Sequence, residues 1–234
     1  MKIRLLALLI LLTMNAVLSG EGNATPPLPL STPLPVKPKC DMCEGGAISL
    51  TGISESKWLE PTQRANAWKI PFELTNQSGE TVRFEKLIGK PTAVTFLYTR
   101  CENPNKCPLA ASTMAKLQTE VEKAGLSEQV QLAIMTYDPE FDTPSVLKSY
   151  AVERGLRCNS NVMMLRPEPK IKSQLFEIMN VTVNYDAKRV NIHGLQLMLL
   201  DKSGRFVRNY QTLIWDNQKV LADLKKLLTE SANQ

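Results

Sequence analysis

The sequence predicts an α/β fold in which a central mixed sheet is flanked by helices. Short apolar runs rich in β-branched and aromatic residues alternate with segments whose apolar residues recur at helical spacing. The clearest run covers residues 92–98 and follows the turn Gly89-Lys90-Pro91, which predicts a buried strand. Apolar residues at helical spacing from Leu109 to Leu117 then predict a helix that reaches about residue 123.

Upstream of that strand, the chain predicts an N-terminal hairpin. Residues 70–75 form its first strand, residues 77–80 the turn and residues 81–84 the returning strand. A helical turn over residues 84–88 ends at Gly89 and leads into the central strand.

Downstream of the first helix, strands and helices continue to alternate. Strands are expected over residues 129–137, 162–165, 190–201 and 206–210, and the last two form a hairpin through residues 202–205. Helices are expected from Asp142 or Thr143, one of which caps the helix, to Gly155, over residues 170–179, and from about Asp216 onward. His193 stands at the entry of the strand over residues 190–201.

Five cysteines occur as two close pairs and one single residue: Cys40 with Cys43, Cys101 with Cys107, and Cys158. This is not the spread, even framework of a disulfide-stapled domain, so we interpret it as two reactive pairs and a partly buried bystander thiol. Cys107 precedes Pro108 at the start of the predicted helix, where the helix dipole favours a thiolate and lowers a cysteine pKa. A cysteine pair between a strand and a helix is typical of a thioredoxin-like fold; the alternative is a structural disulfide that closes a short loop.

The N-terminal residues predict export. Residues 1–20 have the layout of a signal peptide, in which Lys2 and Arg4 precede an apolar stretch. Small residues follow, and we expect cleavage near Ser19 or Gly20. The apolar stretch is shorter than the roughly 20 residues of a membrane span, which disfavours an uncleaved anchor. We therefore expect a location in the periplasm or cell envelope.

Residues 21–44 predict a proline-rich tether that ends in the motif Cys40-Asp41-Met42-Cys43. The motif is compatible with a redox pair, with half of a metal site and with a small local disulfide. Residues 45–69 predict an irregular arm, and residues 70–230 the folded thioredoxin-like domain.

The composition allows one folded core and disfavours a nucleic-acid-binding protein. Hydrophobic residues make up 43% of the 234 residues, which suffices for one domain once the leader and tether are set aside. The formal net charge of +5 is a mild surplus, and no basic run is interleaved with aromatic residues. We expect a monomer that lies near a membrane at most.

Several short motifs resemble the Sco/SenC family of exported, thioredoxin-like copper-handling proteins. They span about residues 70–228 and occur in the order Gly89-Lys90-Pro91, Tyr98-Thr99-Arg100-Cys101, Cys107-Pro108, Asp138-Pro139-Glu140 with Asp142-Thr143-Pro144, and His193 ahead of Leu199-Leu200-Asp201 and Gly204. In that family two cysteines and one histidine bind copper, and the protein helps to load or reduce the copper centre of cytochrome oxidase. The resemblance implies copper ligation by Cys101, Cys107 and His193, with Asp138 as an accessory neighbour. It also implies a partner, either the copper-bearing subunit of cytochrome oxidase or another exported copper or thiol protein.

One departure from the family concerns the spacing of the cysteine pair. The family places three residues between its two cysteines, whereas the five residues 102–106 intervene here. We interpret this as a two-residue insertion that keeps both Cys101 and Cys107. A longer loop loosens the geometry of the pair, so we expect its copper affinity and disulfide potential to differ from the family's norm.

Each candidate residue also has a plain structural explanation. His193 is the only histidine of the chain, and by itself such a residue is more often structural than a ligand. Asp138 could simply cap the turn through Pro139. Taken together, however, two thiolates and one imidazole suit Cu(I), and with an added oxygen ligand they also suit Cu(II).

Three functions are compatible with these residues. The first is a copper metallochaperone that exchanges ligands with an acceptor protein. The second is an exported thiol–disulfide oxidoreductase, in which Cys101 and Cys107 cycle while Cys40 and Cys43, as accessory residues, form a tethered relay pair. The third is a protein that only binds a partner, because the insertion has disabled both chemistries. We favour the first and leave enzymatic activity open.

Overall fold

The fold is described from a computed structural model of the chain. The described residues are 54–55, 57–64, 72–187, 189–211 and 214–232, and all of them belong to one structural unit, residues 39–234. The predicted signal peptide (residues 1–20) and tether (residues 21–44), with Cys40 and Cys43, lie outside the described residues. The predicted arm over residues 45–69 is described only in part.

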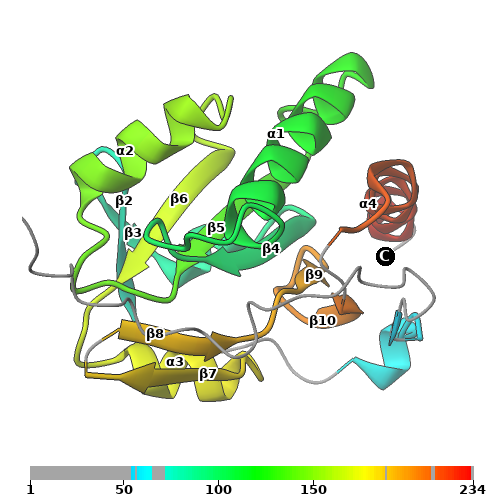
Figure 1. The fold of residues 1–234 in the computed structure, drawn as a ribbon. Coiled ribbons are helices and arrows are strands. Elements are labelled where there is room, and N and C mark those ends of the chain that lie inside the picture. The colour runs from blue at the N-terminus through cyan, green and yellow to red at the C-terminus, as the bar shows by residue number, and fades with distance from the viewer. Residues whose placement is uncertain (1–53, 56, 65–71, 188, 212–213, 233–234) are drawn as a thin grey trace, which may run out of the picture. The chain divides into compact units, whose positions relative to one another are not determined.

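Eight strands of the described chain form one mixed sheet in the order β1-β10-β9-β4-β5-β6-β2-β3 (Figure 1). Their bounds are β1 Ser54–Glu55, β2 Glu73–Asn76, β3 Thr81–Arg83, β4 Thr92–Leu97, β5 Gln131–Thr136, β6 Val162–Pro167, β9 Leu197–Leu200 and β10 Phe206–Gln211. Strand β4 pairs in parallel with β5, and β5 pairs in parallel with β6. The other pairings of these strands are antiparallel. The predicted α/β fold with a central mixed sheet and an N-terminal hairpin is confirmed.

Helices cover both faces of this sheet. Their bounds are α1 Cys107–Lys123, α2 Pro144–Glu153, α3 Lys172–Ile178 and α4 Asn217–Ala232, with short 3₁₀ turns η1 Pro61–Gln63 and η2 Phe84–Leu87. One apolar cluster joins the sheet to α1, α2 and α4, and a second joins it to α3 and η2. Figure 1 shows α1 and α2 on one side of the sheet and α3 on the other. None of the described helices has both the length and the apolar character needed to cross a membrane.

The central strand β4 is buried on both faces, as its largely apolar and β-branched sequence predicts. Ala93 and Leu97 contact the cluster under α1, whereas Val94 and Phe96 contact the cluster under α3. The loop that follows β4 therefore leaves the sheet from a rigid strand.

The strand predicted over residues 190–201 is divided in two, so this prediction is wrong. β8 (Arg189–His193) pairs antiparallel with β7 (Val183–Asp186) in a separate two-stranded sheet, and β9 belongs to the main sheet. The exposed positions of β8 fit a strand with one face in solvent, whereas β9 is apolar and buried throughout. Sequence patterns did not predict β7, because it is short and its exposed positions are polar.

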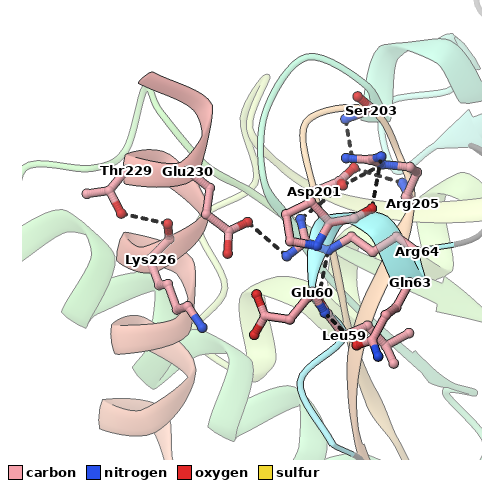
Figure 2. Close-up of polar contacts among 11 residues, drawn as sticks. Leu59, Glu60, Gln63, Arg64, Asp201, Ser203, Arg205, Lys226, Thr229 and Glu230 are labelled. Carbon is pink, nitrogen blue, oxygen red and sulfur yellow. Dashed lines mark hydrogen bonds and ion pairs between the residues drawn. The ribbon is translucent and has the colours of Figure 1, made fainter. Parts of the chain in front are cut away.

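The described residues of the arm lie against β10 and α4. β1 pairs with β10, and the Leu59 N–H donates to a β10 carbonyl at 3.0 Å. The buried Arg64 guanidinium donates to the Leu59 carbonyl at 3.0 Å, to Asp201 at 3.2 Å and to Glu230 at 2.8 Å (Figure 2). Arg205 donates to the same oxygen of Asp201 at 2.8 Å. We call Arg64, Asp201, Arg205 and Glu230 the arm cluster.

Candidate metal centre

The structure brings Cys101, Cys107 and His193 together. Two sulfur atoms and one ring nitrogen from these residues all lie within 4.8 Å of one another. The three residues are 8%, 0% and 6% exposed, so the donor atoms face one another inside the protein. Cys107 and His193 are 86 positions apart in the sequence, and the fold alone makes them neighbours.

Cys107 is placed by α1, which begins at this residue. Pro108 occupies the second helical position, where the missing N–H would have had no partner inside the helix. The apolar face of α1 packs on the sheet and buries Cys107 completely. The predicted placement of Cys107 and Pro108 at the start of a helix is confirmed.

Cys101 lies in the loop between β4 and α1, where its N–H donates to the Tyr98 carbonyl at 3.3 Å. The residues between the two cysteines form an exposed turn: Asn103 Oδ1 accepts from the Asn105 N–H at 2.9 Å, and the Asn103 carbonyl accepts from the Lys106 N–H at 3.1 Å. The extra length of the loop is thus taken up on the surface, while the two sulfur atoms stay close.

His193 ends β8, and its ring lies between the rings of Tyr98 and Tyr137 at centroid distances of 5.3 and 5.2 Å. Nδ1 is 3.1 Å from the Gly194 carbonyl, which also accepts from the Tyr137 hydroxyl at 2.8 Å. Because a carbonyl can only accept, Nδ1 donates this hydrogen bond, and in the corresponding neutral tautomer of imidazole the lone pair is on Nε2. That nitrogen lies 3.8 Å from Cys107 Sγ. Sequence patterns predicted neither Tyr137 nor Gly194 at the site, since such contacts leave no local pattern.

The two thiols have opposite acidities. A hydrogen bond from the Cys107 thiol lowers the pKa of Cys101, although burial opposes the shift. Burial raises the pKa of Cys107 well above its ordinary value, and the hydrogen bond and charge of Cys101 raise it further. The prediction that the helix start lowers the pKa of Cys107 is therefore wrong, because complete burial outweighs the helix dipole. The Cys101 thiol is therefore the more acidic of the two.

The donor set fits a soft metal ion. At bond lengths of roughly 2.0–2.3 Å, typical of imidazole and thiolate ligands, three donors around one ion stand about 3.5–4 Å apart. The distance between Cys107 Sγ and His193 Nε2, 3.8 Å, lies in this range. Two sulfurs and one imidazole are the ligands that Cu(I) prefers. Among the described residues, the group includes no carboxylate.

Asp138, the predicted accessory residue, contacts Arg100. Its Oδ2 accepts from Arg100 Nε at 2.9 Å and also from Nη2, and within the described chain its Oδ1 has no hydrogen-bond partner. Cys158 is half-buried at the edge of the apolar cluster under α1, where burial raises its pKa. Neither residue belongs to the three-donor group.

Sequence reasoning missed the role of Asp142. Of the two proposed caps, Thr143 caps α2. Asp142 instead accepts hydrogen bonds from Thr99 and Thr136, and burial raises its pKa although these bonds oppose the shift. One sequence signal could have identified Asp142, namely its position after a predicted strand. Asp142 follows β5 and Cys101 follows β4, and the carboxyl ends of parallel strands lie at the same edge of a sheet.

The fold and the buried group together define a thioredoxin-like protein with a candidate metal centre of two sulfurs and one imidazole. The SCO1/SenC family model matches residues 60–229, and the chain belongs to this family. The family predicted from the sequence motifs is confirmed.

Individual relatives span most of the folded part. The SCO2-like protein of Rickettsia prowazekii is 29% identical over 145 residues, which is 60% of this chain and 67% of that protein. Among solved structures, Bradyrhizobium japonicum ScoI with copper bound is 27% identical with a TM-score of 0.57, covering 70% of this chain and 99% of that one. A SCO1/SenC family lipoprotein from Bacillus anthracis is 26% identical with a TM-score of 0.60, covering 70% and 97%.

Proposed function

We propose that this chain is an exported metallochaperone that binds copper as cargo through Cys101, Cys107 and His193. The observation that carries the proposal is the convergence of the three donor atoms within 4.8 Å in a buried site. The relative from Bradyrhizobium japonicum was solved with copper bound, which supports copper as the metal.

The chemistry of the donors favours Cu(I). Soft thiolates stabilise this ion, and a three-coordinate site leaves room for a ligand from an acceptor to enter during transfer. Cys101 already has a lowered pKa, so binding chiefly requires the Cys107 proton to leave. His193 presents an unprotonated Nε2 because its other nitrogen donates to the Gly194 carbonyl.

A Cu(I) competition titration on fully reduced protein tests the site. We expect Cys101→Ser, Cys107→Ser and His193→Ala each to weaken binding by about 10-fold or more, which is about 1.4 kcal/mol. Cys158→Ser is the matched control, since its thiol lies outside the three-donor group, and should bind as wild type does. Binding that is indifferent to His193→Ala would contradict the site.

The acceptor and the location are further parts of this proposal. We propose that copper passes to the copper-bearing subunit of cytochrome oxidase, or to another exported copper or thiol protein, in the periplasm or cell envelope. Two measurements test this: the mass of the mature N-terminus, expected to begin near residue 20, and the appearance of copper in the purified acceptor domain after mixing. A retained leader or an acceptor that stays copper-free would count against it.

A second candidate function, thiol–disulfide exchange, is favoured by the unequal acidity of the cysteine pair. The Cys101 thiolate would attack a partner disulfide, form a mixed disulfide and release one partner thiolate. Cys107, after losing its proton, would attack Cys101 Sγ, close the Cys101–Cys107 disulfide and release the second partner thiolate, so that two electrons pass to the partner. Trapping of a mixed disulfide on Cys101 by a Cys107→Ser variant would support this function. The proposed relay through Cys40 and Cys43 predicts a mixed disulfide between the two pairs.

A further inference from the structure

The loop between β5 and α2, residues 138–143, carries two buried carboxylates, and we call it the acidic loop. Asp138 is 1% exposed and Asp142 is 0% exposed. A buried carboxylate costs folding free energy unless hydrogen bonds compensate it, so its partners identify what it stabilises. Each carboxylate has a hydrogen-bond partner in the two residues that precede Cys101.

Asp142 joins the ends of two neighbouring strands. Its Oδ2 accepts from the Thr99 N–H at 3.2 Å and from the Thr136 hydroxyl, and its Oδ1 accepts from the Thr99 hydroxyl. Thr99 is the second residue after β4 and Thr136 is the last residue of β5. Both oxygens of the carboxylate are therefore used to fix the backbone and the side chain at residue 99.

The same loop also fixes Arg100. Asp138 accepts from two nitrogens of the Arg100 guanidinium, and the ring of Phe141 lies 4.2 Å from the guanidinium carbon, as in a cation–π contact. The Asp138 N–H in turn donates to Thr136 at 2.9 Å, which ties the two carboxylates into one network. Two consecutive residues before Cys101 are thus bound to the acidic loop.

This network matters because Cys101 differs from the other two donors. Cys107 is the first residue of α1 and His193 the last of β8, whereas Cys101 lies outside any helix or strand. The residues after it form an exposed turn. Only the residues before Cys101 offer it a rigid attachment.

We propose that Asp142, assisted by Asp138, is a positioning residue that holds the Cys101 sulfur opposite Cys107 and His193. The inference rests on the copper-binding function proposed above. Asp142 acts through Thr99 and touches neither the donors nor the metal. Loss of its hydrogen bonds would free the loop at residue 99, so that Cys101 becomes more exposed and the three donors no longer converge.

The test combines two readouts on Asp142→Ala, Thr99→Val and Thr99→Ser. The first is the alkylation rate of each cysteine in reduced, metal-free protein, assigned by peptide mass spectrometry. We expect Asp142→Ala and Thr99→Val to speed alkylation of Cys101 severalfold and to leave Cys107 unchanged. The second readout is Cu(I) affinity, which we expect Asp142→Ala to lower by roughly 10-fold or more, as loss of an orienting residue does.

Two controls separate positioning from general loss of stability. Thr99→Ser keeps the hydroxyl and should behave as wild type. If Asp142→Ala does not fold, the comparison of Thr99→Ser with Thr99→Val tests the positioning role instead. Asp201→Asn weakens a buried acid of the arm cluster and should leave Cys101 alkylation unchanged. Equal alkylation rates in wild type and Thr99→Val, or an equal increase in Asp201→Asn, would overturn the positioning role. If wild type binds no Cu(I), the proposed function fails, while the alkylation rates still decide the positioning role.

Discussion

The arm cluster and the candidate metal centre are both built around buried polar groups, but their atoms are paired in different ways. In the arm cluster, opposite charges meet: Arg64 and Arg205 both contact Asp201, and Arg64 also contacts Glu230 (Figure 2). In the metal centre, two sulfurs and one imidazole nitrogen face one another, and all three are atoms that can donate a lone pair to a metal ion.

This difference separates a structural cluster from a candidate functional site. Complementary charges compensate one another for their loss of water, so such a cluster can hold an arm on a domain. Converging lone-pair donors do not compensate one another for the loss of water. They shift each other's pKa instead: Cys107 lowers the pKa of Cys101, and Cys101 raises the pKa of Cys107. A cluster of side chains whose pKa values are shifted, but which contains no ion pairs, is therefore a better indication of a reactive or metal-binding site than a cluster of ion pairs.

The largest expected effect is a loss of stability in the arm cluster. Asp201→Ala removes one of the two carboxylates that contact the buried Arg64 guanidinium and also the partner of Arg205, which should lower the free energy of unfolding by about 3–5 kcal/mol. Urea unfolding of reduced protein measures this. The exposed pair of Lys123 and Glu120 is the control, since Lys123→Ala should cost less than about 1 kcal/mol. Equal losses in both variants would remove the distinction between a buried cluster and a surface pair.

The next effect concerns pH and the metal centre. The lowered pKa of Cys101 in the folded state adds to the free energy of unfolding. This contribution is fully present above the pKa of the unfolded thiol, about 8.5, and is lost as the pH falls toward and through the folded-state pKa. The raised pKa of Cys107 acts oppositely and removes stability as the pH rises past about 8.5. As the pH rises from about 5 to about 8, the free energy of unfolding of metal-free wild type should therefore increase relative to that of Cys101→Ser.

Urea unfolding of both proteins at several pH values measures this difference. If the difference in free energy of unfolding between the two proteins stays constant over this pH range, the pKa of Cys101 is not lowered in the folded state. The arm cluster gives a reference, because Arg205→Lys should shift stability equally at each pH in this range.

A smaller effect is expected behind the histidine. Tyr137→Phe removes the hydroxyl that donates to the Gly194 carbonyl, which should cost about 1 kcal/mol of stability. It should also weaken Cu(I) binding severalfold, because that carbonyl orients the His193 ring. Tyr185→Phe is the matched control: its hydroxyl donates to the Tyr137 carbonyl at 2.6 Å, so it should lower stability without changing copper affinity. Parallel losses of affinity in both variants would speak against ring orientation.

The smallest effect is expected in the inserted turn. Deleting Pro104 and Asn105 shortens an exposed loop, and loop length alone changes stability by less than about 1 kcal/mol. Because the sulfurs of Cys101 and Cys107 already lie within 4.8 Å, Cu(I) affinity should stay close to that of wild type. A competition titration with the shortened protein measures it. A large gain in affinity would show that the insertion loosens the site, as the sequence analysis expected.

Much of the fold could be predicted because its signals are local. Apolar runs and turn residues marked β4, β5 and β10, and Pro108 and Pro144 marked the starts of α1 and α2. The prediction failed at residues 190–201, where β-branched and apolar residues occur on both sides of Gly194 although the chain changes sheets there. Strand partners are chosen by distant segments, so local pattern could not show that change.

The sequence by itself determined the alternation of strands and helices, the family, and the three candidate donors, because periodicity and motif spacing are properties of neighbouring residues. Only the tertiary structure decided that the pKa of Cys101 is lowered and that of Cys107 raised, that Asp142 fixes Thr99, and that Arg64 meets Asp201 from 137 positions away. Burial and hydrogen-bond partners set these outcomes, and both depend on which distant segments the fold brings together.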